Sequence, residues 1–180
     1  MNILIKDRGT NHMMHFPLPI QQVIAVQLDE QGYVPVGVAA IRMQPLVDVL
    51  VSAGMNISQF NRVAKLTNAM SRSELEKFFM AVVAFYPLFA GYPDSFVVVA
   101  QAAASVFTYD DCNSFQELGE KVSTDSSELK NTFNTGLRYA SQNVVGFYGG
   151  KAVVLRNEDY CRAERELSHD SDDCSEIETE

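Results

Sequence analysis

The sequence predicts an α+β domain with strands near both ends of its globular part and a central bundle of about five helices. Three observations predict it. The run 23–28 is β-favouring, and Gly149-Gly150 separates two apolar runs near the other end. Between them, apolar residues recur at helical spacing behind Ser71 and Ser114. The 180 residues, 47% hydrophobic, suit one domain with a sizeable core and exclude collagen-like, fully disordered and disulfide-scaffold proteins.

The first forty residues predict a sheet. Ile3, Ile5 and the run 23–28 favour β structure, and 29–32 supplies turn residues, so we expect a hairpin from about Gln22 to Ile41. Pro17 and Pro19 restrict the intervening stretch to a loop or an edge strand.

Helices are expected next, and each has a start or stop signal. Pro45 suits a first helical residue of a segment ending at Gly54, and Asn56 or Ser58 can cap the segment that runs to Met70. Ser71–Glu74 and Ser114–Glu117 are capping boxes. Pro87 is expected to stop or kink the helix that follows Ser71. Residues 95–107 should form a helix that is apolar nearly all round, which suits a core or an oligomer interface. Residues 126–141 should form a further helix, with Leu129, Phe133, Leu137 and Ala140 on one face.

A C-terminal hairpin is predicted over 144–155, because Gly149-Gly150 permits the positive φ angles of a tight primed turn. We expect this hairpin to join the first sheet, which completes an α+β domain over residues 1–156.

Residues 157–180 are expected to form an acidic tail. The segment holds ten acidic and two basic residues, whereas residues 1–156 have a net charge of −1. With few apolar residues, the tail should be mobile and either solubilising or a docking element for a basic partner. Its candidate interaction residues are Asp170, Asp172, Asp173, Glu176, Glu178 and Glu180.

Residues 45–69 admit a helix-turn-helix interpretation. The second helix would present Gln59, Asn61, Arg62 and Lys65 to bases and phosphates, with the acidic tail as a competitor. The alternative is an ordinary αα-hairpin, because the turn is loose and the second helix carries few cations.

Three other patterns do not favour a metal, phosphate or catalytic site. On a strand, the spacing of His12 and His15 points them to opposite faces, which disfavours a shared metal. The glycines before Lys151 lack P-loop spacing, and residues 109–112 are interpreted as a helix cap rather than an acid–base pair. We therefore expect no catalytic residue, no metal and no cofactor.

The apolar stretch 78–107 is interrupted by Pro87 and by 91–94, so it favours buried helices over a membrane span. Three cysteines without Cys-x-x-Cys spacing, and no signal peptide, indicate a cytoplasmic protein.

These patterns favour a non-catalytic protein–protein interaction factor, of the inhibitor, immunity, adaptor or assembly-chaperone type, with an acidic docking tail. The first alternative is a structural subunit of a larger assembly such as a virion. The second is a nucleic-acid-binding protein regulated by the tail. The expected partner is a protein, one with a basic surface if the tail is recognised, and a homo-oligomer is a further expectation.

Overall fold

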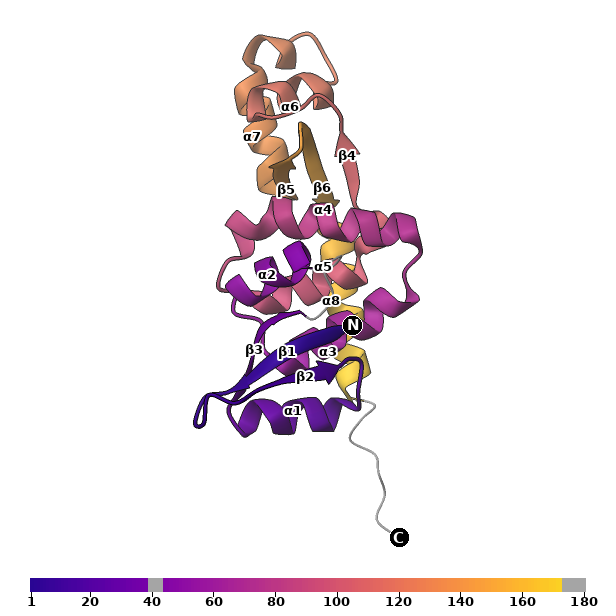
Figure 1. Ribbon diagram of the computed structural model, residues 1–180. Coiled ribbons are helices and arrows are strands. Elements are labelled where there is room, and N and C mark those ends of the chain that lie inside the picture. Colours follow the sequence, from indigo (N-terminus) through magenta and orange to yellow (C-terminus); the bar gives the residue numbers. More distant parts are fainter. Residues whose placement is uncertain (39–43, 173–180) are drawn as a thin grey trace.

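The computed structural model describes residues 1–38 and 44–172, and in these it confirms the α+β class. Two three-stranded sheets lie toward opposite ends of an elongated molecule, and helices fill the space between them (Figure 1).

The first sheet contains β1 (Asn2–Asp7), β2 (Met13–Pro17) and β3 (Tyr33–Val38), all antiparallel in the order β2-β1-β3. Ile3 and Ile5 of the central strand point into the core, where both are fully buried. As expected for a segment that ends in proline, β2 is an edge strand.

The hairpin predicted over 22–41 is wrong in its first arm, because Gln22–Glu30 forms helix α1. Tertiary contacts with α3 outweigh the β propensity of Val23 and Ile24. The Asp29 carboxylate accepts from the amides of Ile57 and Ser58, both at 2.8 Å, and thereby anchors the end of α1 to the start of α3. The return strand is present as β3, although the predicted residues 39–41 lie outside the described part of the chain.

Four helices make the middle layer: α2 (Gln44–Ser52), α3 (Ile57–Ala69), α4 (Arg72–Phe89) and α5 (Pro93–Gln101). The predicted caps are confirmed, since Asn56 and Ser71 each accept a hydrogen bond from the amide three residues on, within reciprocal capping boxes. α4 runs two residues past Pro87, and α5 ends six residues before the predicted boundary at Phe107.

The second sheet contains β4 (Phe107–Tyr109), β5 (Asn143–Tyr148) and β6 (Lys151–Arg156), in the order β4-β6-β5. The predicted hairpin is confirmed, with φ of +60° at Gly149 and +80° at Gly150. The expectation that it joins the first sheet is wrong. β6 pairs with β4 instead, and β5 packs against α4, where a Cβ at Gly146 would lie 2.1 Å from the carbonyl oxygen of Ala84.

Helices α6 (Phe115–Val122) and α7 (Thr132–Gln142) cover the second sheet, and a short 3-10 helix at Glu128–Asn131 precedes α7. The two helices approach so closely that their backbones touch. A Cβ at Gly119 would lie 1.7 Å from the carbonyl oxygen of Thr132, and one at Gly136 would lie 1.8 Å from that of Phe115. Glycine is therefore required at both positions of this crossing.

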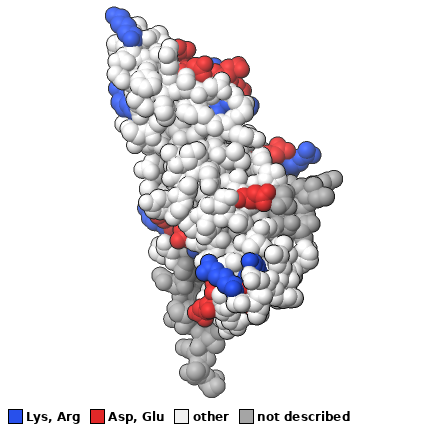
Figure 2. Space-filling model, turned by 60° about the vertical axis from the view of Figure 1, so that its left-hand side comes forward, with Lys and Arg blue, Asp and Glu red and all other residues white. Residues whose placement is uncertain are grey.

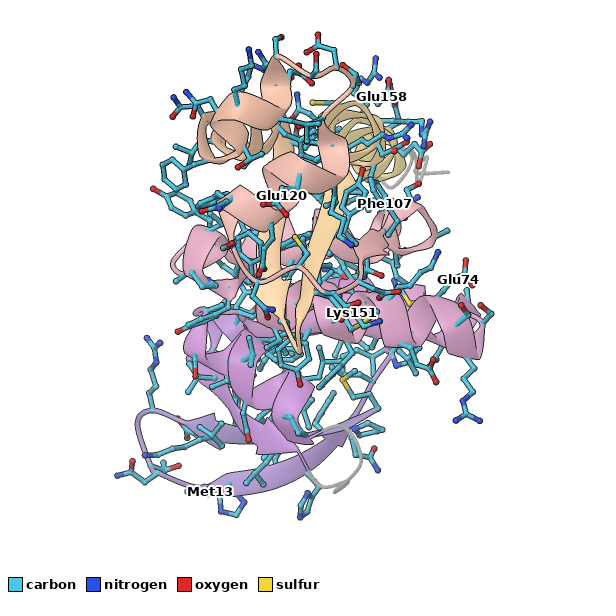
Figure 3. All side chains as sticks on the ribbon, turned by 90° about the horizontal axis from the view of Figure 1, so that it is seen from above. Met13, Glu74, Phe107, Glu120, Lys151 and Glu158 are labelled. Carbon is cyan, nitrogen blue, oxygen red and sulfur yellow. The ribbon has the colours of Figure 1, made fainter. Side chains whose placement is uncertain are left out.

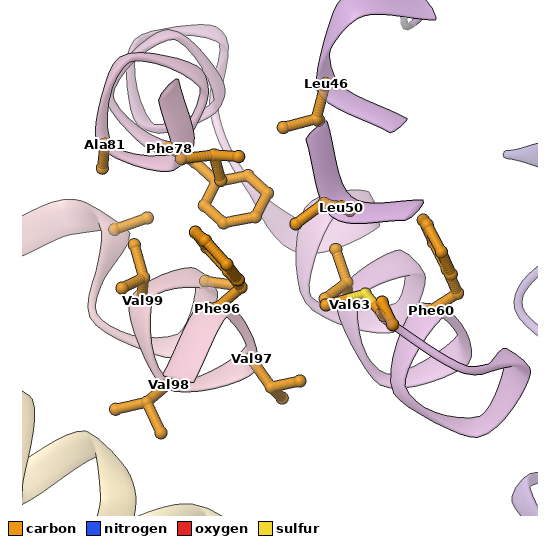
Figure 4. Packing of buried hydrophobic residues seen from close by; sticks show 14 of the residues in the cluster. Leu46, Leu50, Phe60, Val63, Phe78, Ala81, Phe96, Val97, Val98 and Val99 are labelled. Carbon is orange, nitrogen blue, oxygen red and sulfur yellow. The ribbon is translucent and has the colours of Figure 1, made fainter. Parts of the chain in front are cut away.

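The buried apolar side chains form two clusters that meet at the second sheet. The larger one lies among the middle helices, where Phe60, Phe78 and Phe96 are fully buried (Figure 4). The smaller one lies under α6 and includes Leu118 and Cys112. β6 serves both clusters, because alternate residues of a strand point to opposite faces: Val153 and Leu155 belong to the larger cluster, and Ala152 and Val154 to the smaller.

Residues 157–172, which the sequence analysis assigned to a mobile tail, form helix α8 (Asn157–Asp172) against α5. The acidic composition of this segment obscured a helical pattern, in which Tyr160, Ala163 and Leu167 recur at helical spacing and point inward. Tyr160 packs on Phe89 with 6.0 Å between ring centroids. Residues 173–180 lie outside the described part of the chain.

Candidate interaction surfaces

Asn61, predicted to contact nucleic acid, is fully buried. Its side-chain oxygen accepts from the amide of Ile20 at 2.8 Å, and its nitrogen donates to Ile20 O at 3.1 Å and to Gln22 Oε1 at 2.8 Å. These bonds use both N–H donors and one lone pair of the Asn61 amide. The buried side chain thereby fastens the segment before α1 to α3 and cannot reach a base in this fold.

The other three predicted nucleic-acid contacts, Gln59, Arg62 and Lys65, do not share one environment. Gln59 completes the capping box of α3 and also donates to Asp94 at 2.8 Å. Arg62 lines a shallow hollow beside Asp94 and Glu164, while Lys65 is exposed. In addition, α2 packs against β3 and α4, whereas α3 packs against α1 and α5, so each helix has its main contacts with other elements.

The acidic residues proposed as a docking tail follow a helix that is held in place. Asp170 and Asp172 belong to the last turn of α8, and Asp173, Glu176, Glu178 and Glu180 lie outside the described residues. Gln101 of α5 donates to Glu166 at 2.9 Å, one turn before the acidic run begins. The start of that run is thus fixed relative to the body.

The segment 109–112 brings two carboxylates and a thiol close together in the sequence. Lys151 lies 2.5 Å from Asp110 and, by hydrogen bond and charge, lowers the pKa of that carboxyl. Cys112 is buried, and burial together with the nearby Glu117 raises its thiol pKa. Burial and the hydroxyl of Tyr109, 3.5 Å away, raise the pKa of Tyr139. The shifts thus favour the ionised form of Asp110 and the protonated forms of Cys112 and Tyr139.

Three hollows among the described residues measure about 150, 220 and 330 Å³. The largest lies between the 3-10 helix and α7, where Asn131, Asn134 and Arg138 contribute to its lining. Arg138 pairs with Glu128 there at 2.6 Å. Within the described ranges, no three His, Cys, Asp or Glu side chains gather where they could hold a metal ion.

An apolar surface extends over the short 3-10 helix and α7. Leu129 of the 3-10 helix and Phe133 and Leu137 of α7, which the sequence places on one helical face, have exposed fractions of 56%, 52% and 39%. The close crossing with α6 buries Thr135 and Gly136 instead, which leaves Phe133 and Leu137 facing outward. The spacing was informative, but the two glycines decide which side of α7 is buried.

The first sheet and α1 carry a second set of exposed apolar side chains: Met13, Val23, Ile24, Val26 and Val36. Met13 lies at the outer margin of the sheet (Figure 3). No Lys, Arg, Asp or Glu occurs from Gly9 to Leu28, a stretch that includes β2 and most of α1.

Charge is sparse over much of one side of the molecule. Figure 2 turns forward the side on which Figure 1 shows α7, and basic and acidic side chains stand mainly near the margins and the lower end of this face. In the residues that the structure covers, no helix is long and apolar enough to cross a membrane.

Comparisons with protein-family models, with curated proteins and with solved structures gave no match. The fold and these surfaces therefore carry the functional argument by themselves.

Proposed function

We propose that this protein is a non-catalytic protein–protein interaction factor. The observation that carries the proposal is an exposed apolar surface, called the α7 surface below, formed by Leu129 of the short 3-10 helix and by Phe133 and Leu137 of α7. Three large exposed apolar side chains on two consecutive helical segments are more than the isolated exposure that every soluble protein shows.

The surroundings of this surface suit a protein partner. Specific interfaces have an apolar centre and a polar rim. Here Phe133 and Leu137 supply the centre, while Asn134 and Arg138 line the adjacent hollow and supply polar groups. Phe115 contacts the Phe133 ring edge-on, at 6.5 Å between centroids, so the exposed aromatic is held by a neighbour before a partner arrives.

The acidic end of the chain adds an electrostatic element to the proposal. Six acids and no base occur in residues 170–180, which follow the part of α8 that packs on α5. Such a run attracts a basic surface over about one Debye length, roughly 8 Å at physiological salt. We assign it to steering a basic partner, with the α7 surface supplying specificity.

Affinity capture from host extract, followed by binding measurements with the purified partner, tests this function. The variants are Phe133→Ser/Leu137→Ser and a chain ending at His169, which lacks the six acids but keeps Ala163 and Leu167. The matched control is Leu88→Ser, because Leu88 is also about half exposed but lies at the end of α4.

The double variant should lose the partner, and the shortened chain should bind it more slowly and with a weaker salt dependence. Thermal unfolding confirms that each variant folds. A partner retained at full affinity by the folded double variant contradicts the proposed α7 surface.

The alternative functions lead to different results. A structural subunit of a larger assembly should elute far above the 20.0 kDa of one chain in the absence of any partner. Nucleic-acid binding through Arg62 and Lys65 stays a prediction, and it requires that removal of the acidic run increase affinity for DNA or RNA.

A further inference from the structure

The free edge of β2 presents backbone groups in a defined alternation. Leu18 and Met1 exchange backbone hydrogen bonds, and the amide of Asp7 donates to the carbonyl of His12. In an antiparallel ladder, every second residue bonds to the neighbouring strand. The register therefore turns Met14 and Phe16 toward β1, and it directs the N–H and C=O groups of Met13 and His15 outward.

The β2 edge lacks the charged side chains that usually protect an exposed edge strand from pairing with another chain. Natural edge strands avoid association through lysines, inward charges, bulges or covering elements. β2 reads Met-Met-His-Phe-Pro, so Pro17 at one end is its only residue without an amide donor. Among the described elements, β1 is the one with which β2 forms an extensive contact.

From this geometry we infer that a second copy of the chain pairs with β2 in an antiparallel arrangement, and that the protein is a dimer with a continuous six-stranded sheet. In the register centred on Met14, the Met13 amide donates to the His15 carbonyl of the second copy, and the His15 amide donates to the Met13 carbonyl. The two-fold axis repeats both bonds. Centring on His15 instead would set Met13 against Pro17, which has no amide to donate.

The distribution of charge favours a second copy over an unrelated strand. A chain with a net charge of −9 repels a second copy, and this repulsion is weakest where the two copies meet through segments without charged side chains. The stretch 9–28 satisfies that condition, because it contains no Lys, Arg, Asp or Glu. In this register Met13, 54% exposed, lies opposite His15 and diagonally beside Met13 of the second copy.

The test is the molar mass in solution between about 1 and 200 μM, by light scattering and sedimentation, for the full chain and for Met13→Lys/His15→Lys. Both lysines stand on the exposed side of the edge strand, where natural edges tolerate them. The matched control is Leu88→Lys/Tyr92→Lys, which adds the same charge at another exposed apolar site. We expect twice the 20.0 kDa chain mass for the full chain and the control, and the mass of one chain for the β2 variant.

Amide hydrogen exchange locates the contact. In the dimer, Met13 and His15 should exchange slowly, whereas dilution to the monomer should accelerate both and leave Met14 and Phe16 protected by β1. A full chain that stays monomeric at 200 μM overturns the inference. A dimer that survives the β2 substitutions, or that leaves the Met13 and His15 amides unprotected, places the contact elsewhere and also overturns it. Neither outcome depends on the α7 surface, so this test is separate from that of the proposed function.

Discussion

At the scale of a residue, the buried side-chain amide of Asn61 positions a distant segment of the chain. Its three hydrogen bonds hold Ile20 and Gln22, and so they fix where the chain enters α1. From sequence, Asn61 beside Arg62 was one of four candidate contacts of an alternative nucleic-acid-binding function. The misassignment arose because partners forty residues away in the chain decide whether an asparagine faces water.

Substitution of Asn61 by alanine should therefore destabilise the protein. The change leaves the amide and carbonyl of Ile20 without their bonds in a partly buried site, and an unsatisfied buried group costs about 1–3 kcal/mol. Urea unfolding should show a loss of about 2–4 kcal/mol. Lys65→Ala, on the exposed side of the same helix, is the control and should change stability by less than about 0.5 kcal/mol. Equal stability of the two variants would contradict the anchoring role.

At the scale of elements, capping residues in the sequence predicted where several helices begin. The sequence did not predict which faces of the helices are buried. Asn56, Ser71 and Ser114 cap helices as expected, because a cap depends on residues within one turn. The identity of α1 and the orientation of α7 depend on distant contacts. A β-branched run became a helix against α3, and an apolar stripe turned to solvent because Gly119 and Gly136 let two backbones meet.

The crossing of α6 and α7 gives a prediction at this scale. Gly136→Ala places a methyl group where 1.8 Å separates it from a carbonyl oxygen, so the helices must move apart. Overpacking of this kind costs about 1–3 kcal/mol, and a clash with backbone should reach the upper end. Thermal unfolding and hydrogen exchange of α7 measure it, with Asn134→Ala on the exposed side of the helix as control. Unchanged protection of α7 would show that the crossing is looser than described.

At the scale of the whole molecule, the sequence predicted the class and the order of most elements but joined the sheets wrongly. Strand pairing depends on β4, a strand of three residues with no recognisable local pattern, and on the fit of Gly146 against α4. The acidic character of the C-terminal segment concealed α8, since net charge masks a stripe of only three inward residues.

The shared strand β6 predicts cooperative unfolding. Its alternating side chains belong to both apolar clusters, so neither cluster can lose β6 and keep its packing. Val154→Ala, which faces the smaller cluster, should lower the stability of both ends equally in one transition. Hydrogen exchange resolved by segment checks this, with α3 reporting the larger cluster and α6 the smaller. Separate transitions for α3 and α6 would show that the clusters unfold independently.

The position of β6 along the chain also matters while the protein is being synthesised. Translation adds about 5–20 residues per second, and residues 151–156 leave the ribosome long after α4 and α5. Until β6 is synthesised, both apolar clusters lack one of their packing partners, and the apolar faces of these helices stay accessible to other nascent chains. β6 thus joins both clusters late in synthesis, and among the described elements α8, which adds Ala163 and Leu167 to the larger cluster, follows it. Folding of this protein in the cell should accordingly depend on holding factors that shield its first 150 residues until β6 arrives.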